Sequence, residues 1–208
     1  MITDKGKELK ETEEFTLLIT PLFLQYNTRA KLESMQSLYV CSDIHGNFKH
    51  FNDFVTLAGD NPIAILGDFC PDSFEFSQLL KQMKNTMTLV RGNCDISYDF
   101  SMVGIPVPPM INSLSFDKRT IILTHGHYYK SPSMIPVTLH KGDIYLSGHT
   151  HKETLFIDNK GIIIGNPGSL TYPRGECGPS YMIIKKTRIL IKELYGSTVK
   201  SLTLPQIL

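Results

Sequence analysis

The stretch Leu38-Tyr39-Val40-Cys41-Ser42-Asp43-Ile44-His45-Gly46-Asn47 joins a short apolar run to a block of polar side chains. The run over residues 38–41 predicts a buried β-strand, so the polar block begins at the carboxyl end of that strand. Within the block, Asp43 supplies a carboxylate and His45 supplies an imidazole. Both groups are ligands for divalent cations, and the strand therefore leads directly into a candidate metal-binding pair.

The same arrangement recurs four more times, and each later polar block also follows an apolar run. In chain order these blocks are Gly67-Asp68, Gly92-Asn93-Cys94-Asp95, His125-Gly126-His127 and Gly148-His149-Thr150-His151. The first three blocks are evenly spaced, because Asp43, Asp68 and Asn93 are 25 residues apart. A β-α-β step of that length would carry each successive side chain to the end of the next strand. Together the blocks supply oxygen and nitrogen ligands for two divalent cations.

The segments between the first blocks predict an α/β fold. Apolar runs over 63–66 and 88–90 predict two further buried strands, and the stretches 48–57 and 73–84 predict helices. This β-α-β-α-β order favours parallel strands with right-handed crossovers. Ligands of open α/β sheets bind outside the carboxyl ends of the strands, so the first three blocks are expected to converge there.

The second half of the chain predicts hairpins. Strands over 111–116 and 120–124 flank Asp117-Lys118-Arg119, and strands over 154–157 and 162–164 flank Asp158-Asn159-Lys160-Gly161. A short helix over 134–140 and a strand over 144–146 are expected between the two hairpins. Strands over 181–185 and 188–192 are expected to close the sheet.

The composition of the 208 residues, 41% hydrophobic and 20% charged, is ordinary for a soluble globular protein. The formal net charge is +1, so no basic field attracts nucleic acid, and cations must neutralise an anionic substrate. The four cysteines have no paired spacing, which favours a reducing, cytoplasmic location. No apolar run approaches the roughly 20 residues of a membrane helix, so no membrane partner is expected.

The mixed ligand set narrows the metal chemistry. Imidazole suits Mn, Fe, Co, Ni or Zn, whereas a magnesium or calcium site would be built from oxygen atoms and a structural zinc site would be rich in cysteine. Two metals about 3.5–4 Å apart that share a carboxylate can activate a bridging hydroxide for attack on phosphorus. Asp68 is central among the blocks and is the best candidate for the shared ligand.

In this order, the blocks resemble the motifs of the calcineurin-like metallophosphoesterases, and more narrowly of their YfcE-like phosphodiesterase branch. The segment Asn166-Pro167-Gly168-Ser169 is also typical of that branch, and the resemblance covers roughly residues 36–195. It implies a four-layer α/β/β/α sandwich with a dinuclear metal site, often activated by manganese, at the carboxyl ends of the strands. It further implies one metal on Asp43, His45, Asp68 and His151, and a second on Asp68, Asn93, His125 and His149.

One position departs from the broader superfamily. Many of its phosphatases have a histidine after the third-block asparagine, where it helps to protonate the leaving group, and here that position is Cys94. A thiol with a pKa near 8.5 is a poor substitute for imidazole, so we expect modest turnover, a preference for activated diesters and no acid role for Cys94. Catalytic roles are predicted for Asp68, Asn93 and His127. His127 is expected to face the substrate or to support a ligand, because seven residues already fill both metal sites.

Other polar residues have simpler interpretations. Asp95 is expected to orient a neighbouring histidine or to cap a helix rather than to bind metal. His50 and His140 are expected to be ordinary surface or helix histidines. Arg174 could clamp a phosphate, but a solvated loop arginine is the favoured interpretation.

Residues 1–34 contain none of the blocks. We therefore expect an N-terminal extension over 1–34 and a metallophosphoesterase domain over 35–208. The extension could be an upstream addition, a capping helix or an oligomerisation arm, and homo-oligomerisation also stays open.

Two functions stay open at this point. The first is a metal-dependent phosphodiesterase or phosphatase acting on a small phosphodiester or phosphomonoester. The second is a catalytically weak metal-binding scaffold of the same fold, like the retromer subunit that resembles this family. The presence of His45 and Asn93 favours the enzyme, because a degenerate scaffold can lose these positions. A nuclease is less attractive, because the chain has no arginine-rich or aromatic strip.

Overall fold

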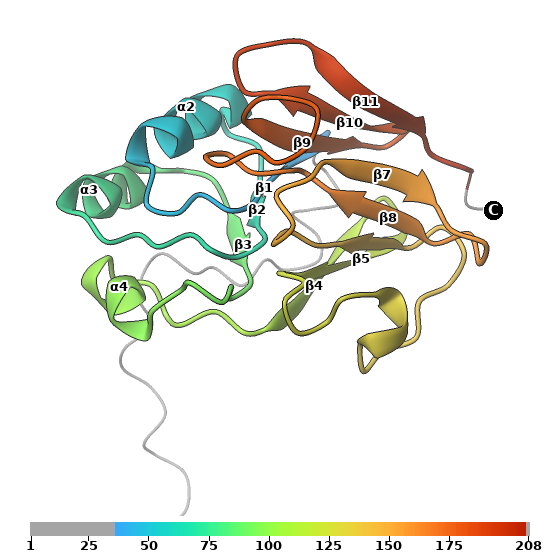
Figure 1. Cartoon of the computed structure of the whole chain (residues 1–208), viewed down its shortest axis with the longest axis horizontal. Helices are drawn as coiled ribbons and strands as arrows, with labels where there is room; N and C mark the ends of the chain where they lie inside the picture. The colour runs from blue at the N-terminus through green and yellow to red at the C-terminus, as the bar shows by residue number, and fades with distance from the viewer. Residues whose placement is uncertain (1–35, 207–208) are drawn as a thin grey trace, which may run out of the picture.

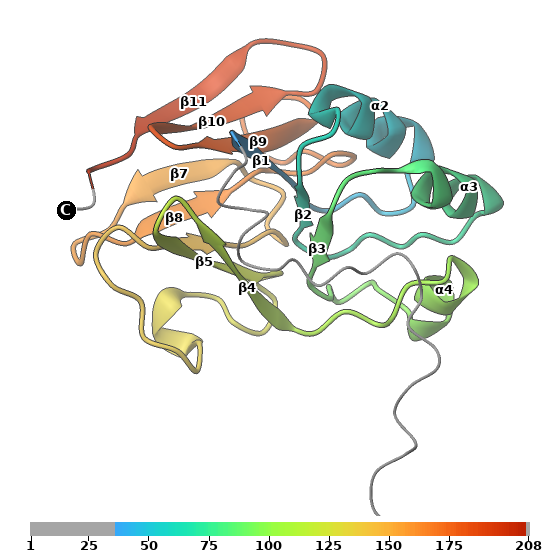
Figure 2. The same ribbon diagram turned by 180° about the vertical axis from the view of Figure 1, so that it is seen from behind.

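The computed structural model describes residues 36–206, and the expected extension over 1–34 lies outside the described residues. The described chain forms two β-sheets that pack face to face, with helices against one of them (Figures 1 and 2). Within this part of the chain, no helix has both the length and the apolar composition that crossing a bilayer requires. The predicted α/β class is confirmed.

The first sheet has six strands in the order β11-β10-β9-β1-β2-β3. Its parallel part consists of β1 (Ser37–Cys41), β2 (Ile63–Ile65) and β3 (Met87–Leu89), connected through the helices α2 (Phe48–Ala58) and α3 (Phe74–Gln82). The predicted β-α-β-α-β unit is therefore confirmed. A further helix, α4 (Ser97–Met102), has no counterpart among the predicted elements, because six residues with one buried side chain, Phe100, show no clear periodicity.

Three antiparallel strands extend the first sheet beyond β1. They are β9 (Ser180–Lys185), β10 (Arg188–Glu193) and β11 (Thr198–Thr203). The strands predicted over 181–185 and 188–192 are confirmed. The edge strand β11 escapes prediction, because none of its six residues is fully buried and no apolar side is evident.

The second sheet has five strands in the order β4-β5-β6-β8-β7. They are β4 (Ile111–Phe116), β5 (Arg119–Thr124), β6 (Ile144–Leu146), β7 (Thr154–Ile157) and β8 (Ile163–Asn166). Both predicted hairpins are confirmed. The first turns on Asp117 and Lys118, with left-handed φ angles of 47° and 64°, as in a two-residue hairpin turn, while Arg119 opens β5.

Two apolar cores hold the layers together. The core between the sheets contains side chains from both of them, including Leu38 of β1 and Leu123 of β5. The second core lies between the first sheet and its helices, and it is built on Phe51 of α2, Phe76 of α3 and Phe100 of α4. Figure 1 shows these three helices gathered on one side of the molecule.

The outer face of the second sheet is covered by the segment between β5 and β6. Ile135 of this segment packs with Ile122 of β5 and Tyr145 of β6. The segment contains one 3-10 turn, η1 (Pro132–Met134), so the helix expected over 134–140 is wrong. Ile135 has φ −80° and ψ 150°, the extended backbone that a following proline favours. The layering of the four-layer sandwich is confirmed, but its last layer is this segment with a 3-10 turn rather than an α-helix.

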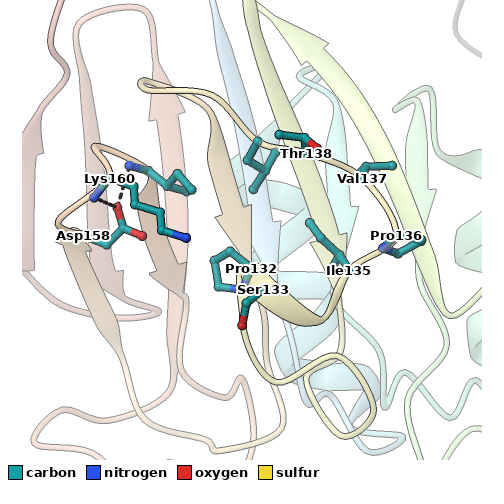
Figure 3. Close-up of a pocket in the computed structure, with 10 residues that line it drawn as sticks. Pro132, Ser133, Ile135, Pro136, Val137, Thr138, Asp158 and Lys160 are labelled. Carbon is teal, nitrogen blue, oxygen red and sulfur yellow. Dashed lines mark hydrogen bonds between the residues drawn. The ribbon is translucent and has the colours of Figure 1, made fainter.

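A pocket of about 470 Å³ lies between this covering segment and the β7–β8 turn (Figure 3). Ile135 and Val137 contribute to one wall, and Asp158 and Lys160 of the turn contribute to the other. None of the residues that line the pocket belongs to the five polar blocks. It is therefore separate from the predicted metal site.

Replacing Phe51 with alanine is expected to lower the free energy of unfolding by about 3–5 kcal/mol, because the ring is fully buried among other rings, with Phe69 at a centroid distance of 4.9 Å. The matched control is Phe74→Ala, since the Phe74 side chain is 72% exposed; it should change stability by at most about 0.5 kcal/mol. Urea denaturation followed by circular dichroism measures both. Equal losses in the two variants would contradict the described packing.

Candidate metal centre

The five polar blocks meet at one place, where strands from both sheets end. Asp43 follows β1, Asp68 follows β2, Asn93 follows β3, His125 follows β5, and His149 and His151 follow β6. The expected convergence of the first three blocks is confirmed, and it includes the two blocks of the second sheet. The reason is that β5 and β6 run parallel, so their carboxyl ends lie at the same edge.

One group of metal-binding atoms consists of Asp43, His45 and His151. Nε2 of His151 lies 3.1 Å from Oδ1 of Asp43 and 3.3 Å from Nε2 of His45. All three side chains point into the same small volume, and the Asp43 side chain is completely buried.

A second group surrounds His125. Its Nε2 lies 3.1 Å from Oδ1 of Asn93 and 3.4 Å from Oδ2 of Asp68. The ring of His149 is 5.1 Å from the ring of His125, measured between centroids. The same Oδ2 of Asp68 is 3.8 Å from Nε2 of His45, so the Asp68 carboxylate lies between the two groups.

Two of these histidines are oriented by backbone carbonyls behind them. Nδ1 of His125 donates to the carbonyl of Leu66, and Nδ1 of His151 donates to the carbonyl of Tyr172, both at 2.7 Å. A carbonyl only accepts hydrogen bonds, so Nδ1 carries the proton in each ring. In the neutral imidazole, Nε2 is then unprotonated and presents its lone pair to the site.

In the neutral form of His151, the Nε2 lone pair therefore faces Asp43 with no hydrogen atom between them. Oδ1 of Asp43 is buried, has no hydrogen-bond partner within residues 36–206, and lies 3.1 Å from Nε2 of His151. Two ligands bound about 2.1 Å from one cation at right angles are about 3 Å apart. A divalent cation would satisfy both atoms, so these residues fit a metal ion.

The pKa values of the two aspartates shift in opposite directions because their surroundings differ. Burial raises the pKa of Asp43. Burial also raises the pKa of Asp68, but the hydrogen bond from protonated His125 and the one from the Cys94 backbone outweigh it and hold the pKa well below its usual range. Burial lowers the pKa of His125, and Asp68 more than offsets this, so the pKa is raised. A cation that binds here therefore competes with a proton for His125.

Left-handed backbone is concentrated on the predicted ligands. The φ angles are 55° at Asp43, 48° at His45, 49° at Asp68, 67° at His149 and 61° at His151. Residues other than glycine adopt this conformation at a cost of about 1–3 kcal/mol, and such strain gathers at functional sites. Here it is held by tertiary hydrogen bonds, since the amides of Ile44 and His45 both donate to the carbonyl of Asp68.

Two glycines allow the close approach of these loops. A Cβ atom on Gly92 would overlap the carboxylate and the backbone nitrogen of Asp68. A Cβ atom on Gly148 would overlap the hydroxyl of Ser42 and lie 2.8 Å from Oδ2 of Asp43. Any side chain at either position would displace a carboxylate of the site.

Asp95 neither orients a histidine nor caps a helix, which corrects that expectation. Its buried carboxylate accepts four backbone N–H groups, from Asp68 (2.9 Å), Phe69 (2.8 Å), Cys70 (3.0 Å) and Gly92 (2.7 Å). Both carboxylate oxygens are occupied by these bonds. Asp95 therefore fixes the loops after β2 and β3 to each other.

The remaining polar residues lie at the edge of the centre or away from it. His127 is half-buried, with its ring 5.3 Å from that of His125, and burial lowers its pKa. Its predicted catalytic role stays a prediction. Arg174 is exposed, as expected of a loop arginine, and so is His140. His50 is more than a surface residue, because its Nδ1 donates to the Leu170 carbonyl and ties α2 to the loop before β9.

The segment 166–171 supports the centre in a way that its sequence does not reveal. The Ser169 hydroxyl donates to the carbonyl of Asp43 at 2.8 Å, and the Thr171 hydroxyl donates to the carbonyl of Ile44 at 2.7 Å. The Asn166 amide donates to the carbonyl of Gly148 at 2.8 Å. The only signal for these roles is the family-typical Asn166-Pro167-Gly168-Ser169, since the partners are backbone atoms far away in the chain.

Replacing Asp95 with asparagine is expected to lower the free energy of unfolding by about 1–3 kcal/mol. The reason is that the NH₂ group of the new amide would face two backbone N–H groups and could accept a hydrogen bond from neither. We also expect cation affinity to fall about 10–100-fold, as for residues that support metal ligands. Asp60→Asn, at an exposed position, is the matched control. Urea denaturation and calorimetric titration with Mn²⁺ measure the two effects, and unchanged cation affinity would contradict this role.

The chain is 29% identical to the phosphodiesterase YfcE of Escherichia coli K12 over 162 residues, covering 71% of this chain and 86% of that protein. Its structure matches that of YfcE, described as a phosphoesterase from E. coli, with a TM-score of 0.70 and 25% identity, covering 81% of this chain and 100% of that chain. A structure described as a novel archaeal phosphodiesterase shares the fold, with a TM-score of 0.57, 18% identity and coverage of 81% and 99%.

The family itself follows from residues 36–188, which match the model of the calcineurin-like phosphoesterase superfamily domain. The match spans most of the chain and includes all five polar blocks. The resemblance seen in the motifs is thereby confirmed. The chain belongs to the calcineurin-like phosphoesterase superfamily and is a metal-dependent hydrolase of phosphate esters.

Proposed function

We propose that this protein is a phosphodiesterase that hydrolyses small phosphate esters at a centre of two divalent cations. The observation that carries the proposal is the position of the Asp68 carboxylate between the two groups of metal-binding atoms. One carboxylate shared by two cations is a recurring arrangement in phosphoesterases. YfcE of Escherichia coli, which is named as a phosphodiesterase, supports the reaction class. The complete ligand set, including His45 and Asn93, favours hydrolysis over the scaffold alternative.

The proposed ligands divide as the two groups do. Asp43, His45, Asp68 and His151 would hold one cation, and Asp68, Asn93, His125 and His149 would hold the other. When bound, the cations supply Lewis acidity, which polarises phosphoryl oxygens and makes water a stronger acid.

The protein contributes orientation and a neutral histidine. Asp68 lies between the two groups, and Asn93 lies beside His125 in the second group, so both would help to position the reacting phosphate. His127 lies beside His125, and burial lowers its pKa, which supports a neutral ring that would hydrogen-bond a substrate oxygen. Burial and the nearby Asp68 raise the pKa of Cys94 to about 11, so its thiol is a weak acid for protonating a leaving group. This supports a preference for activated diesters.

The residue types also support a particular metal, location and substrate class. The mixed carboxylate, amide and imidazole set supports Mn²⁺, with Ni, Co, Fe and Zn as alternatives. The four cysteines of the chain are all free, which supports a cytoplasmic location. The net charge of +1 supports a small phosphodiester or phosphomonoester rather than nucleic acid.

The central test is hydrolysis of bis-p-nitrophenyl phosphate. The wild-type chain stripped with a chelator should be inactive, and Mn²⁺ should restore activity. Asp68→Asn should lose more than about 100-fold of the restored rate, since loss of a residue that merely supports a ligand already costs 10–100-fold. Asp60→Asn is the matched control and should keep the wild-type rate. Activity that survives the chelator, or that survives Asp68→Asn, would reject the proposed centre.

We also propose that the domain over 35–208 binds its cations without the extension over 1–34. All the proposed ligands and the residues that orient them lie between Ser42 and Tyr172. A chain that starts at Met35 should therefore bind Mn²⁺ with an affinity within about threefold of the full chain, well inside the 10–100-fold expected for a damaged metal site. Calorimetric titration of both chains measures this. A folded, shortened chain that binds no Mn²⁺ would show that the extension takes part in the centre.

A further inference from the structure

The thiol of Cys94 lies among the atoms of the metal centre. Its Sγ, a ring nitrogen of His45 and a carboxylate oxygen of Asp68 all lie within 4.8 Å of one another. The amide of Asn93 lies 3.3 Å from the same sulfur. The backbone N–H of Cys94 donates to Oδ1 of Asp68 at 2.8 Å, which fixes the residue to the carboxylate beside which its thiol stands.

The group of His45, Asp68 and Cys94 shares one residue with the group whose atoms fit a cation. His45 belongs both to the Asp43–His45–His151 group and to the His45–Asp68–Cys94 group. In the first group, the buried Oδ1 of Asp43 has no hydrogen-bond partner within the described residues, and it lies 4.0 Å from Nε2 of His45. A cation bound near His45 would therefore have the Cys94 sulfur within reach as well.

The other cysteines do not share this position. Cys41 is buried in the core against the helices, and Cys177 is near Glu153, on the loop before β9. Cys70 is a near neighbour, but its sulfur points to the Cys94 carbonyl at 3.5 Å rather than joining a metal-binding group. Within residues 36–206, Cys94 is the one cysteine that stands in such a group, and its side chain is exposed to solvent.

We propose that the centre has a second mode of cation binding, in which Cys94 joins His45 and Asp68 as a thiolate ligand of a soft cation. The proposal rests on the metal centre of the proposed function. Thiolate ligands favour soft cations such as Cd²⁺, whereas Mn²⁺ is satisfied by carboxylate, amide and imidazole. A thiol that coordinates such a cation is deprotonated and releases its proton to solvent.

Thiolate binding has a consequence for the reaction. A catalytic metal site keeps one position open for water or substrate, and a fully liganded site is structural. Cys94 stands beside the shared carboxylate, so its sulfur would take up a position that the substrate phosphate needs. Soft cations would then bind tightly and inhibit, while Mn²⁺ would leave the position open. Cys94 would thus set which bound cation gives an active enzyme.

The test is titration of the metal-stripped full chain with Cd²⁺, followed by ultraviolet absorption and by the amount of cadmium retained. The wild-type chain should develop a thiolate-to-cadmium charge-transfer band as cadmium binds. Cys94→Ser should lack the band and bind Cd²⁺ about 10–100-fold more weakly, with Mn²⁺ affinity unchanged. Cys70→Ser and Cys177→Ser are the matched controls, and both should keep the band.

Three results of the cadmium titration would overturn the thiolate mode. Retained cadmium without the band in the wild-type chain, or a band that persists in Cys94→Ser, overturns it. A band lost in Cys70→Ser as well as in Cys94→Ser also overturns it, because the ligand set would then be a different one. Hydrolysis of bis-p-nitrophenyl phosphate with Mn²⁺ on the same preparations separates the two proposals. A Cys94-dependent band in a chain without Mn²⁺-dependent hydrolysis would support the thiolate mode while rejecting the proposed function.

Discussion

The carboxylate of Asp95 is the constraint on which the metal centre depends. It accepts four backbone N–H groups, three from residues 68–70 after β2 and one from Gly92 after β3. A buried N–H without a partner costs about 1–3 kcal/mol, so this single side chain makes a sharply turned loop stable in the interior. The Asp95 carboxylate also lies close to Asp68, since it accepts the backbone N–H of Asp68. A bound cation would offset the repulsion between the two carboxylates.

Everything proposed for the centre follows from the position that Asp95 gives to Asp68. The left-handed backbone of Asp68 aims its carboxylate between the two groups of ligands, and Gly92 leaves room for it. The backbone of Cys94 is fixed to the other oxygen of the same carboxylate. Hydrolysis and thiolate binding are therefore two uses of one positioned carboxylate, and the cation present selects between them.

The sequence predicts the parallel part of the first sheet and the composition of the site for the same reason. Short apolar runs mark buried parallel strands, and the residues directly after them, such as Asp43 and Asp68, must lie at one sheet edge. The partners of Asp95 and Ser169 are not predictable in this way, because they are backbone groups distant in the chain. Sequence patterns also fail to predict β11, in which no residue is fully buried. They likewise miss the end of η1, where Pro136 favours the extended backbone of Ile135.

The origin of the ligands in two different sheets has a thermodynamic consequence. Asp43 and Asp68 come from the first sheet and His125 and His151 from the second, so a bound cation joins the two halves of the sandwich. Unfolding separates these residues, and the unfolded chain has no comparable site. Binding and folding are therefore linked: a cation at 100 times its dissociation constant adds about 2.7 kcal/mol to the stability of the native chain. The supply of metal ions would then govern how long this protein persists as well as how fast it works.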